Sequence, residues 1–212
     1  MYILDSSKYF SKQNCVEITG MPASGKTTFV RQLMDENSNT INVNGDLPKN
    51  NLWRQFKKIM YAFLLFVRFP SLFLKDTKII ISSKQNSYKN LYSVLTNWYL
   101  IIYQYKKYSS GKAIYLWDQG LFQGIWSIYY SSSSNFNYKH LLEDKTLPQT
   151  VYLTDADDLE LIFRSNKRKD NIRLDYNNKE EIINGREAME KTINVMQQIG
   201  YQKTTDRSFK EV

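Results

Sequence analysis

The chain of 212 residues contains one cysteine and one histidine. Cys15 has no partner for an internal disulfide, and its place at the start of an apolar run predicts a small buried side chain. His140 lies in a polar connector with no second histidine or cysteine near it, which argues against a metal-ligating role. The single cysteine indicates a protein of the reducing cytosol, so we expect a cytoplasmic location.

Long hydrophobic runs are also missing. Residues 1–13 carry scattered charges without the apolar core of a signal peptide, so we expect a short lead-in and no export signal. The most apolar stretch, 60–74, is interrupted by Arg68 and Pro70 and is shorter than the ~20 residues of a membrane-spanning helix. A core helix or a flap over the substrate is the favoured interpretation. A peripheral membrane contact or a lipid-linked substrate is the alternative.

The composition is that of a folded protein, with 42% hydrophobic and 15% aromatic residues. The length suits one well-packed domain over residues 1–212. A formal net charge of +8 suits an anionic ligand, a nucleic acid or an acidic membrane surface, so charge alone selects none of these partners.

The most informative stretch is 15–28, which reads as a buried strand, a glycine-bounded loop and a helix start. Its spacing fits G-x-x-x-x-G-K-[ST], with Gly20, Gly25, Lys26 and Thr27 at the defining positions. The two glycines let backbone N–H groups approach an anion, and the following helix N-terminus favours negative charge. Lys26 would reach the terminal phosphates of a nucleotide, and Thr27 would offer its hydroxyl to Mg²⁺. The residues expected to bind the nucleotide are Gly20, Ala23, Ser24, Gly25, Lys26, Thr27 and Thr28.

Two acids follow later strands of the predicted sheet. Asp46 comes after the short strand 41–44, and Asp118 ends the buried run 113–118. The carboxyl ends of parallel strands line the ligand crevice of an open α/β sheet, so both acids are expected near the loop. We interpret Asp46 as the better candidate for the base and Asp118 as the Mg²⁺-associated carboxylate, although these roles could be exchanged.

Apolar periodicity predicts the remaining elements. The strands are expected at 15–20, 41–44, 113–118, 150–153 and 201–204. The helices are expected from 28 to 34, 52 to 67, 89 to 108, 121 to 130, 157 onward and 178 to 199. Alternation of strands and helices implies a parallel sheet covered on both faces.

The fourth strand leads through a helix into a cationic segment at 164–173. Its arginines are Arg164, Arg168 and Arg173. The planar guanidinium can contact two phosphate oxygens and stays charged, so Arg164 and Arg168 are predicted to act on the phosphates, with Arg164 also binding the nucleotide. A solvated charge run is the alternative.

The order of these motifs resembles the P-loop nucleoside and nucleotide kinases, especially the thymidylate-kinase-like group, over nearly the whole chain. The resemblance implies a three-layer α/β/α P-loop fold with a five-stranded parallel sheet in the order 2-3-1-4-5. It also implies an acceptor-side helical region at about 46–109 and a mobile lid at about 164–175. Gln119 follows the third-strand acid where the family often has arginine, so the acceptor stays open.

We therefore expect an ATP- and Mg²⁺-dependent phosphotransferase that moves the γ-phosphoryl group to a nucleoside, nucleotide, sugar or similar small acceptor. Lys26, Arg164 and Arg168 would neutralise charge on the transferring group. The competing interpretation is a P-loop NTPase or a nucleotide-binding regulatory protein that acts through a partner. A GTPase is disfavoured because 166–170 has one residue too many for Asn-Lys-x-Asp. No nucleic-acid partner is expected, and the oligomeric state is open, with a homodimer among the alternatives.

Overall fold

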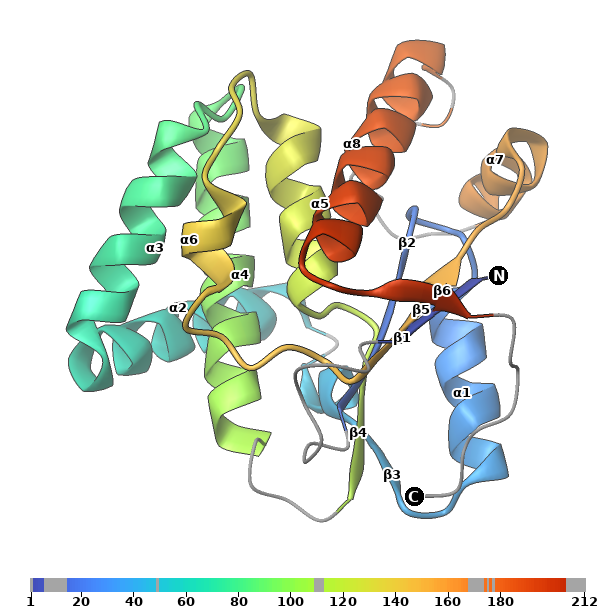
Figure 1. Ribbon diagram of the computed structural model, residues 1–212, viewed down its shortest axis with the longest axis horizontal. Helices are drawn as coiled ribbons and strands as arrows, with labels where there is room; N and C mark the ends of the chain where they lie inside the picture. The colour runs from blue at the N-terminus through green and yellow to red at the C-terminus, as the bar shows by residue number, and fades with distance from the viewer. Residues whose placement is uncertain are drawn as a thin grey trace.

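The computed structural model describes residues 2–5, 15–48, 50–108, 113–167, 174, 176 and 178–204. A six-stranded sheet runs through the molecule with helices on both faces (Figure 1). Its strands are β1 (Tyr2–Asp5), β2 (Cys15–Gly20), β3 (Thr40–Asn42), β4 (Ile114–Trp117), β5 (Thr150–Thr154) and β6 (Gln202–Thr204). The helices are α1 (Lys26–Glu36), α2 (Asn51–Arg68), α3 (Pro70–Ser82), α4 (Tyr88–Tyr108), α5 (Leu121–Ser131), α6 (Tyr138–Leu142), α7 (Asp158–Asn166) and α8 (Lys179–Gln198), with a 3₁₀ turn at Val43–Asp46.

The sheet order is β3-β4-β2-β5-β1-β6. The strands β3, β4, β2 and β5 are parallel neighbours, and they take the relative order expected for the first four predicted strands. The carboxyl ends of β2 and β4 therefore lie at one edge of the sheet, which is where the sequence analysis expects the ligand.

The prediction of an all-parallel five-stranded sheet is wrong, because the sheet has six strands and is mixed. Residues 2–5, expected to be a lead-in, form β1, which lies antiparallel between β5 and β6. Ile3 and Leu4 in this strand are 8% and 3% exposed. A four-residue strand is too short to show a periodic pattern, and its pairing depends on strands that come some 150 residues later.

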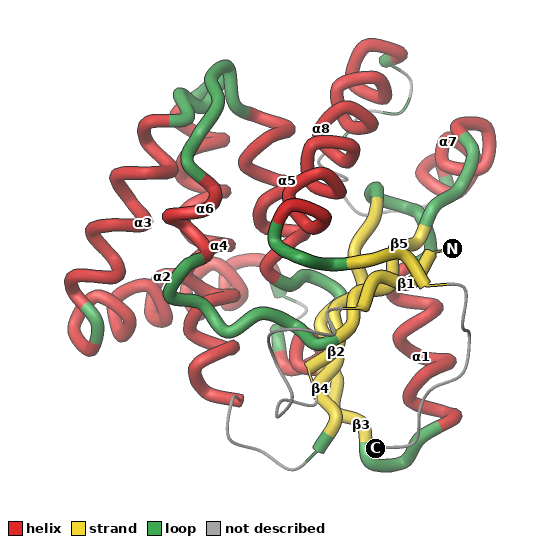
Figure 2. The backbone as a smooth tube through the Cα atoms, viewed as in Figure 1, coloured by secondary structure: helices red, strands yellow, loops and turns green. Residues whose placement is uncertain are grey.

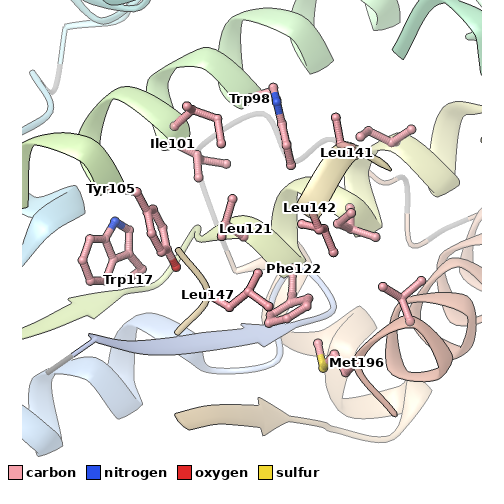
Figure 3. Close-up of a cluster of buried hydrophobic side chains, with 14 of the residues drawn as sticks. Trp98, Ile101, Tyr105, Trp117, Leu121, Phe122, Leu141, Leu142, Leu147 and Met196 are labelled. Atoms are coloured by element: carbon pink, nitrogen blue, oxygen red, sulfur yellow. The ribbon is translucent and has the colours of Figure 1, made fainter. Parts of the chain in front are cut away.

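The two faces of the sheet are covered unequally. Figure 2 shows α1 on one side of the strands and the larger group, α2 to α6 with α8, on the other. Val30 and Leu33 of α1 pack on Ile18 and Leu116 of the sheet. On the opposite face, α4, α5 and α8 contribute nearly half of the buried residues of a large aromatic-rich cluster, part of which Figure 3 shows. A three-layer α/β/α arrangement thus supports the edge at which β2 and β4 end.

A buried ion pair joins the helices of the larger layer. Asp76 of α3 is fully buried, accepts a hydrogen bond from Trp98 Nε1 of α4 at 2.8 Å, and lies 3.1 Å from Lys145 Nζ after α6. Burial raises the pKa of Asp76, and the charge of Lys145 opposes that rise. These contacts fix α3 and α4 relative to each other, and so support the helices beside the candidate site.

The expectation of a core helix is wrong for most of α2. Its only buried residue is Leu65, and nine large apolar side chains are exposed. We call these nine the outer face of α2: Leu52, Trp53, Phe56, Ile59, Met60, Phe63, Leu64, Phe66 and Val67. The periodicity correctly predicts a helix at 52–67, but it does not reveal what covers the apolar side.

Candidate functional site

The loop that follows β2 has the backbone shape expected of an anion cradle. Gly20 has a φ of 154°, and Ala23 and Gly25 have left-handed φ values of 66° and 97°. A Cβ on Gly20 would lie 2.3 Å from the carbonyl oxygen of Thr154, so no larger residue fits there. The Ser24 and Thr154 hydroxyls are 2.7 Å apart and hold the loop against β5. α1 then begins at Lys26, and its first N–H groups face the same loop.

Lys26 lies across this loop. Its Nζ donates hydrogen bonds to the carbonyl oxygens of Gly20 at 2.8 Å and Met21 at 2.9 Å. The positive charge is therefore held over the cradle by the loop itself, next to the N–H groups of α1. A phosphate in the cradle would meet this cation without a large rearrangement of the backbone.

Thr27 and Asp118 meet across the β2–β4 edge. Thr27 Oγ1 donates to Asp118 Oδ2 at 3.4 Å, although the residues are 91 positions apart. Burial raises the pKa of Asp118, while the charge of Lys26 and the hydrogen bond from Thr27 lower it. Within the described ranges, the buried Oδ1 atom of Asp118 has no hydrogen-bond partner. This carboxylate therefore has an oxygen available for a ligand.

The donor set fits Mg²⁺ better than zinc. In the part of the chain that the structure describes, no group of three histidine, cysteine, aspartate or glutamate side chains could hold a metal by itself. Mg²⁺ needs only one or two protein oxygens when phosphates and water complete its shell. Thr27 and Asp118 could supply those oxygens, and their roles at a metal stay predictions.

A buried carboxylate supports the site from behind, and the sequence analysis did not identify it. Glu17 of β2 is fully buried; it accepts a hydrogen bond from the backbone N–H of Gln123 at 2.9 Å and one from Tyr105 OH at 3.3 Å. A Cβ on Gly120 would lie 2.4 Å from Glu17 Cδ, so the glycine leaves room for the carboxylate. Glu17 thus caps the N-terminus of α5. A charged residue in a strand gives no sequence signal for such a distant partner.

Gln123 links this cap to the loop from Gly20 to Gly25, which we call the phosphate loop for its proposed role. Its Oε1 accepts hydrogen bonds from Thr19 Oγ1 and from the N–H of Gly20, both at 3.3 Å. The first turn of α5, directly after Asp118, is therefore tied to the loop that begins at Gly20. This connection fixes the two halves of the candidate site relative to each other.

Replacing Glu17 by glutamine should make protein stability less dependent on pH. Burial raises the pKa of Glu17 from its usual 4.5 to about 7, so the folded protein binds this proton more tightly than the unfolded chain. Its contribution to the free energy of unfolding is full below about pH 4.5 and is lost as pH rises to about 7, at up to about 1.4 kcal/mol per pH unit. Chemical denaturation between these pH values should show a flatter profile for Glu17→Gln. Glu190→Gln, at an exposed site of α8, should keep the wild-type slope; equal slopes for all three proteins would contradict the assignment.

Two pockets meet at the phosphate loop, where both are lined by Ala23 and Gly25. The first has a volume of about 530 Å³ and extends toward Arg164 and Lys167. The second has a volume of about 750 Å³ and extends over Asp118 toward α2, α4 and α5. Molecules bound in the two pockets could therefore both contact the loop.

Besides Lys26, three cations that were not predicted as site residues line the second pocket. They are Arg54 and Lys58 of α2 and Lys89 of α4, and among the described side chains that line the pocket Asp118 is the only acid. Burial, and then the charge of Arg54, lowers the pKa of Lys58 to about 8. Within the described ranges, the buried Oδ1 of Asn44, another lining residue, has no hydrogen-bond partner. Arg54 and Lys58 are four residues apart on the side of α2 opposite its outer face, a pattern that the sequence does contain.

Arg164 lies beside the phosphate loop, at the end of α7. One of its Nη atoms would be 3.1 Å from a Cβ on Gly25, and its guanidinium also pairs with Glu160. α7 begins after Asp157, where the helix was expected, and ends at Asn166. Arg168 and Arg173, with most of the predicted lid at 164–175, lie outside the described residues, so their roles stay predictions.

Asp46 ends the 3₁₀ turn that follows β3, so the short predicted strand 41–44 is in fact a strand and a turn. Its neighbours Asn44, Leu47 and Pro48 line the second pocket. The side chain of Asp46 lies outside the described part of the chain, and its proposed role as the base stays a prediction.

Comparison with protein-family models, with curated proteins and with solved structures finds no match to this chain. No helix in the described ranges is long and apolar enough to cross a membrane.

Proposed function

We propose that this chain is a Mg²⁺-dependent phosphotransferase that moves the γ-phosphoryl group of ATP to a small anionic acceptor. The observation that carries the proposal is the position of the phosphate loop, with Lys26 and the Thr27–Asp118 pair, between two pockets. Two substrates that bind in these pockets would meet at the loop, which is the arrangement that direct transfer requires.

Each residue of the site has a part in this proposal. The loop N–H groups and Lys26 bind the phosphates, and Thr27 and Asp118 hold Mg²⁺. Mg²⁺ would neutralise charge on the phosphates as the group is transferred. Arg164, beside Gly25, supplies a further cation on the nucleotide side. Asp46 remains the proposed base for the acceptor, and Arg168 a proposed cation of the lid.

The charge of the second pocket favours an anionic acceptor over a neutral nucleoside or sugar. Among the described side chains, Lys26, Arg54, Lys58 and Lys89 line it together with one acid, Asp118, whose charge Mg²⁺ would neutralise. Lys58 is half-buried whereas Arg54 and Lys89 are exposed. A phosphomonoester supplies two charges and several acceptor oxygens that such cations can bind. The pKa of Lys58 is lowered first by burial and second by the charge of Arg54, and a bound anion would oppose both effects.

An acceptor panel tests the proposal. With ATP and Mg²⁺, we expect ADP formation that depends on a phosphomonoester, such as a nucleoside monophosphate or a sugar phosphate, and little activity with neutral nucleosides and sugars. Arg54→Ala should raise the acceptor KM by about ten-fold or more, because a charge-assisted hydrogen bond contributes roughly 1.5–3 kcal/mol, while the KM for ATP changes little. Lys57→Ala is the matched control, because Lys57 is a cation of α2 close to Arg54 but is not among the residues that line the pocket.

Three results would count against the proposal. ATP hydrolysis at the same rate without any acceptor would indicate an NTPase. Failure to bind ATP would indicate a loop that has lost its function. Transfer to neutral acceptors with Arg54→Ala unimpaired would contradict the anionic substrate class.

A further inference from the structure

Helix α2 is amphipathic, but its apolar side is exposed and its polar side is turned toward the second pocket. Of the eighteen exposed large hydrophobic residues in the described chain, nine belong to the outer face of α2. Leu52, Phe56, Ile59 and Phe63 follow one another at spacings of three and four, so they form a stripe along one side of the helix. They are 80%, 60%, 50% and 63% exposed. The polar residues Arg54 and Lys58 are instead turned toward the second pocket.

The stripe is long and continuous. Figure 1 shows α2 at the outer edge of the larger helical layer, running across α4. At 1.5 Å per residue, its 18 residues extend about 27 Å. An exposed apolar surface of this length is unfavourable in water unless something covers it, and such surfaces mark interaction sites.

The sequence segment that contains the stripe is strongly cationic, and of its lysines Lys75 is paired with Asp144 and Glu143 from outside the segment. Residues 51–108, which contain α2, α3 and α4, carry ten lysines and arginines and one acid, Asp76. They therefore account for a net charge of +9 in a chain whose total is +8. Asp76 is fully buried and paired with Lys145, so it offers no negative charge to a partner. Lys57 and Arg68 flank the stripe on α2 itself.

From these observations we propose that α2 docks on an anionic phospholipid membrane, with its outer face inserted at the level of the acyl chains and the surrounding cations on the headgroups. A helix with a broad apolar face and basic flanks lies in the plane of the membrane surface in this way. Three of the nine inserting side chains are phenylalanines and one is Trp53, residue types that such interfaces favour.

Charge makes a second copy of the chain a poorer occupant. Two α2 helices packed through the stripe would bring Lys57 and Arg68 of each copy near the cations of the other, and α2 contains no acid that could pair with them. Like charges facing each other across an interface oppose association. An anionic lipid surface could instead bind both groups, with its acyl chains on the apolar stripe and its headgroups on the cations.

The proposal does not depend on the phosphotransferase assignment. Because Arg54 and Lys58 project from the opposite side of α2, docking would place the second pocket directly above the membrane surface. An anionic acceptor would then reach the pocket near the lipid headgroups.

Vesicle binding of the full chain tests the inference. We expect the wild type to sediment with vesicles of phosphatidylcholine and phosphatidylglycerol in a two-to-one ratio, and to bind pure phosphatidylcholine about ten-fold less tightly or weaker, with high salt weakening the anionic interaction. The double variant F56Q/F63Q should lower anionic binding by about ten-fold or more, because exposed apolar side chains are lost without a cavity. L159Q/I183Q, which changes residues that are 80% and 48% exposed on α7 and α8, should bind like the wild type.

Tryptophan fluorescence adds a local readout. Trp53 is 63% exposed, whereas Trp98, Trp117 and Trp126 are at most 2% exposed. A blue shift and quenching by brominated lipid should therefore report on α2, and both should disappear in Trp53→Phe, which retains binding. The double variant K57Q/R68Q should weaken anionic binding by roughly 25-fold, given about five-fold for each cation.

Several outcomes would overturn the inference. The wild type would stay in the supernatant, or it would bind neutral and anionic vesicles equally, or F56Q/F63Q would bind like the wild type. A wild-type dimer in light scattering that F56Q/F63Q converts to a monomer, without vesicle binding, would instead assign the face to a second copy of the chain.

Discussion

Lys26→Ala should reduce phosphoryl transfer by about a thousand-fold while the protein stays folded. Lys26 Nζ lies over the loop and bonds the carbonyl oxygens of Gly20 and Met21, so the change removes the cation nearest the expected phosphates. Stabilisation of charge on the transferring group provides most of the rate enhancement in this chemistry, and loss of one such group typically costs a factor of 10²–10³ or more. Turnover at saturating ATP and ATP affinity by calorimetry measure the two effects.

The fold should tolerate this change because Lys26 is at the first position of α1 and is only partly buried. Lys191→Ala, at an exposed position of α8, is the matched control and should keep full turnover. Wild-type activity together with wild-type ATP affinity in Lys26→Ala would remove the loop from the mechanism.

Asp118→Asn should lower turnover by roughly a hundred-fold or more and raise the Mg²⁺ concentration needed for half-maximal rate. The carboxylate accepts a hydrogen bond from Thr27, and within the described ranges its Oδ1 has no hydrogen-bond partner, so in the proposal this oxygen is left for the metal. A neutral amide is a weaker ligand for a hard cation. A Mg²⁺ titration of the rate measures the effect.

Asp118→Asn should also leave stability unchanged or raise it. The raised pKa of Asp118 means that burial of its charge costs free energy at neutral pH. Lower activity with an equal or higher Tm separates a functional carboxylate from a structural one. Asp35→Asn, at an exposed position of α1, should change neither quantity. If Asp118→Asn retained the wild-type rate and Mg²⁺ requirement, Asp118 would have no role at the metal.

The sequence predicts the phosphate loop and the helices well because their determinants are local. The spacing from Gly20 to Thr27 describes one strand, one turn and one helix start, and the structure has all three. The helix expected at 178–199 is α8, and its cap, which the structure places at Asn178, is also local, because Asn178 accepts a hydrogen bond from the N–H of Glu180. These features depend on residues within a few positions of one another, so no knowledge of the fold is needed.

Features that depend on distant partners could not be predicted. β1 pairs Tyr2 with Leu153, and no short pattern in the sequence announces that contact. The role of Glu17 depends on the backbone of Gln123, 106 positions away. The apolar periodicity of α2 predicts a helix, but whether that side meets a core or solvent is decided by how α2 packs on α4. The sequence shows that Arg54 and Lys58 are four residues apart on one helix, but only the fold shows that they line the same pocket.

The position of Gln123 has a consequence for which molecule could receive the phosphoryl group in the proposed reaction. A side-chain amide presents an acceptor atom at one end and a donor group at the other, and the network around it decides which way it points. Because the Oε1 atom of Gln123 is occupied by Thr19 and Gly20, the Nε2 atom of this pocket-lining residue is the end left for a bound molecule. Reversing the amide would place two N–H groups against the N–H of Gly20, so the orientation is locked. We therefore expect a molecule that contacts this amide to present a lone pair, such as that of a carbonyl or a ring nitrogen, and not an N–H.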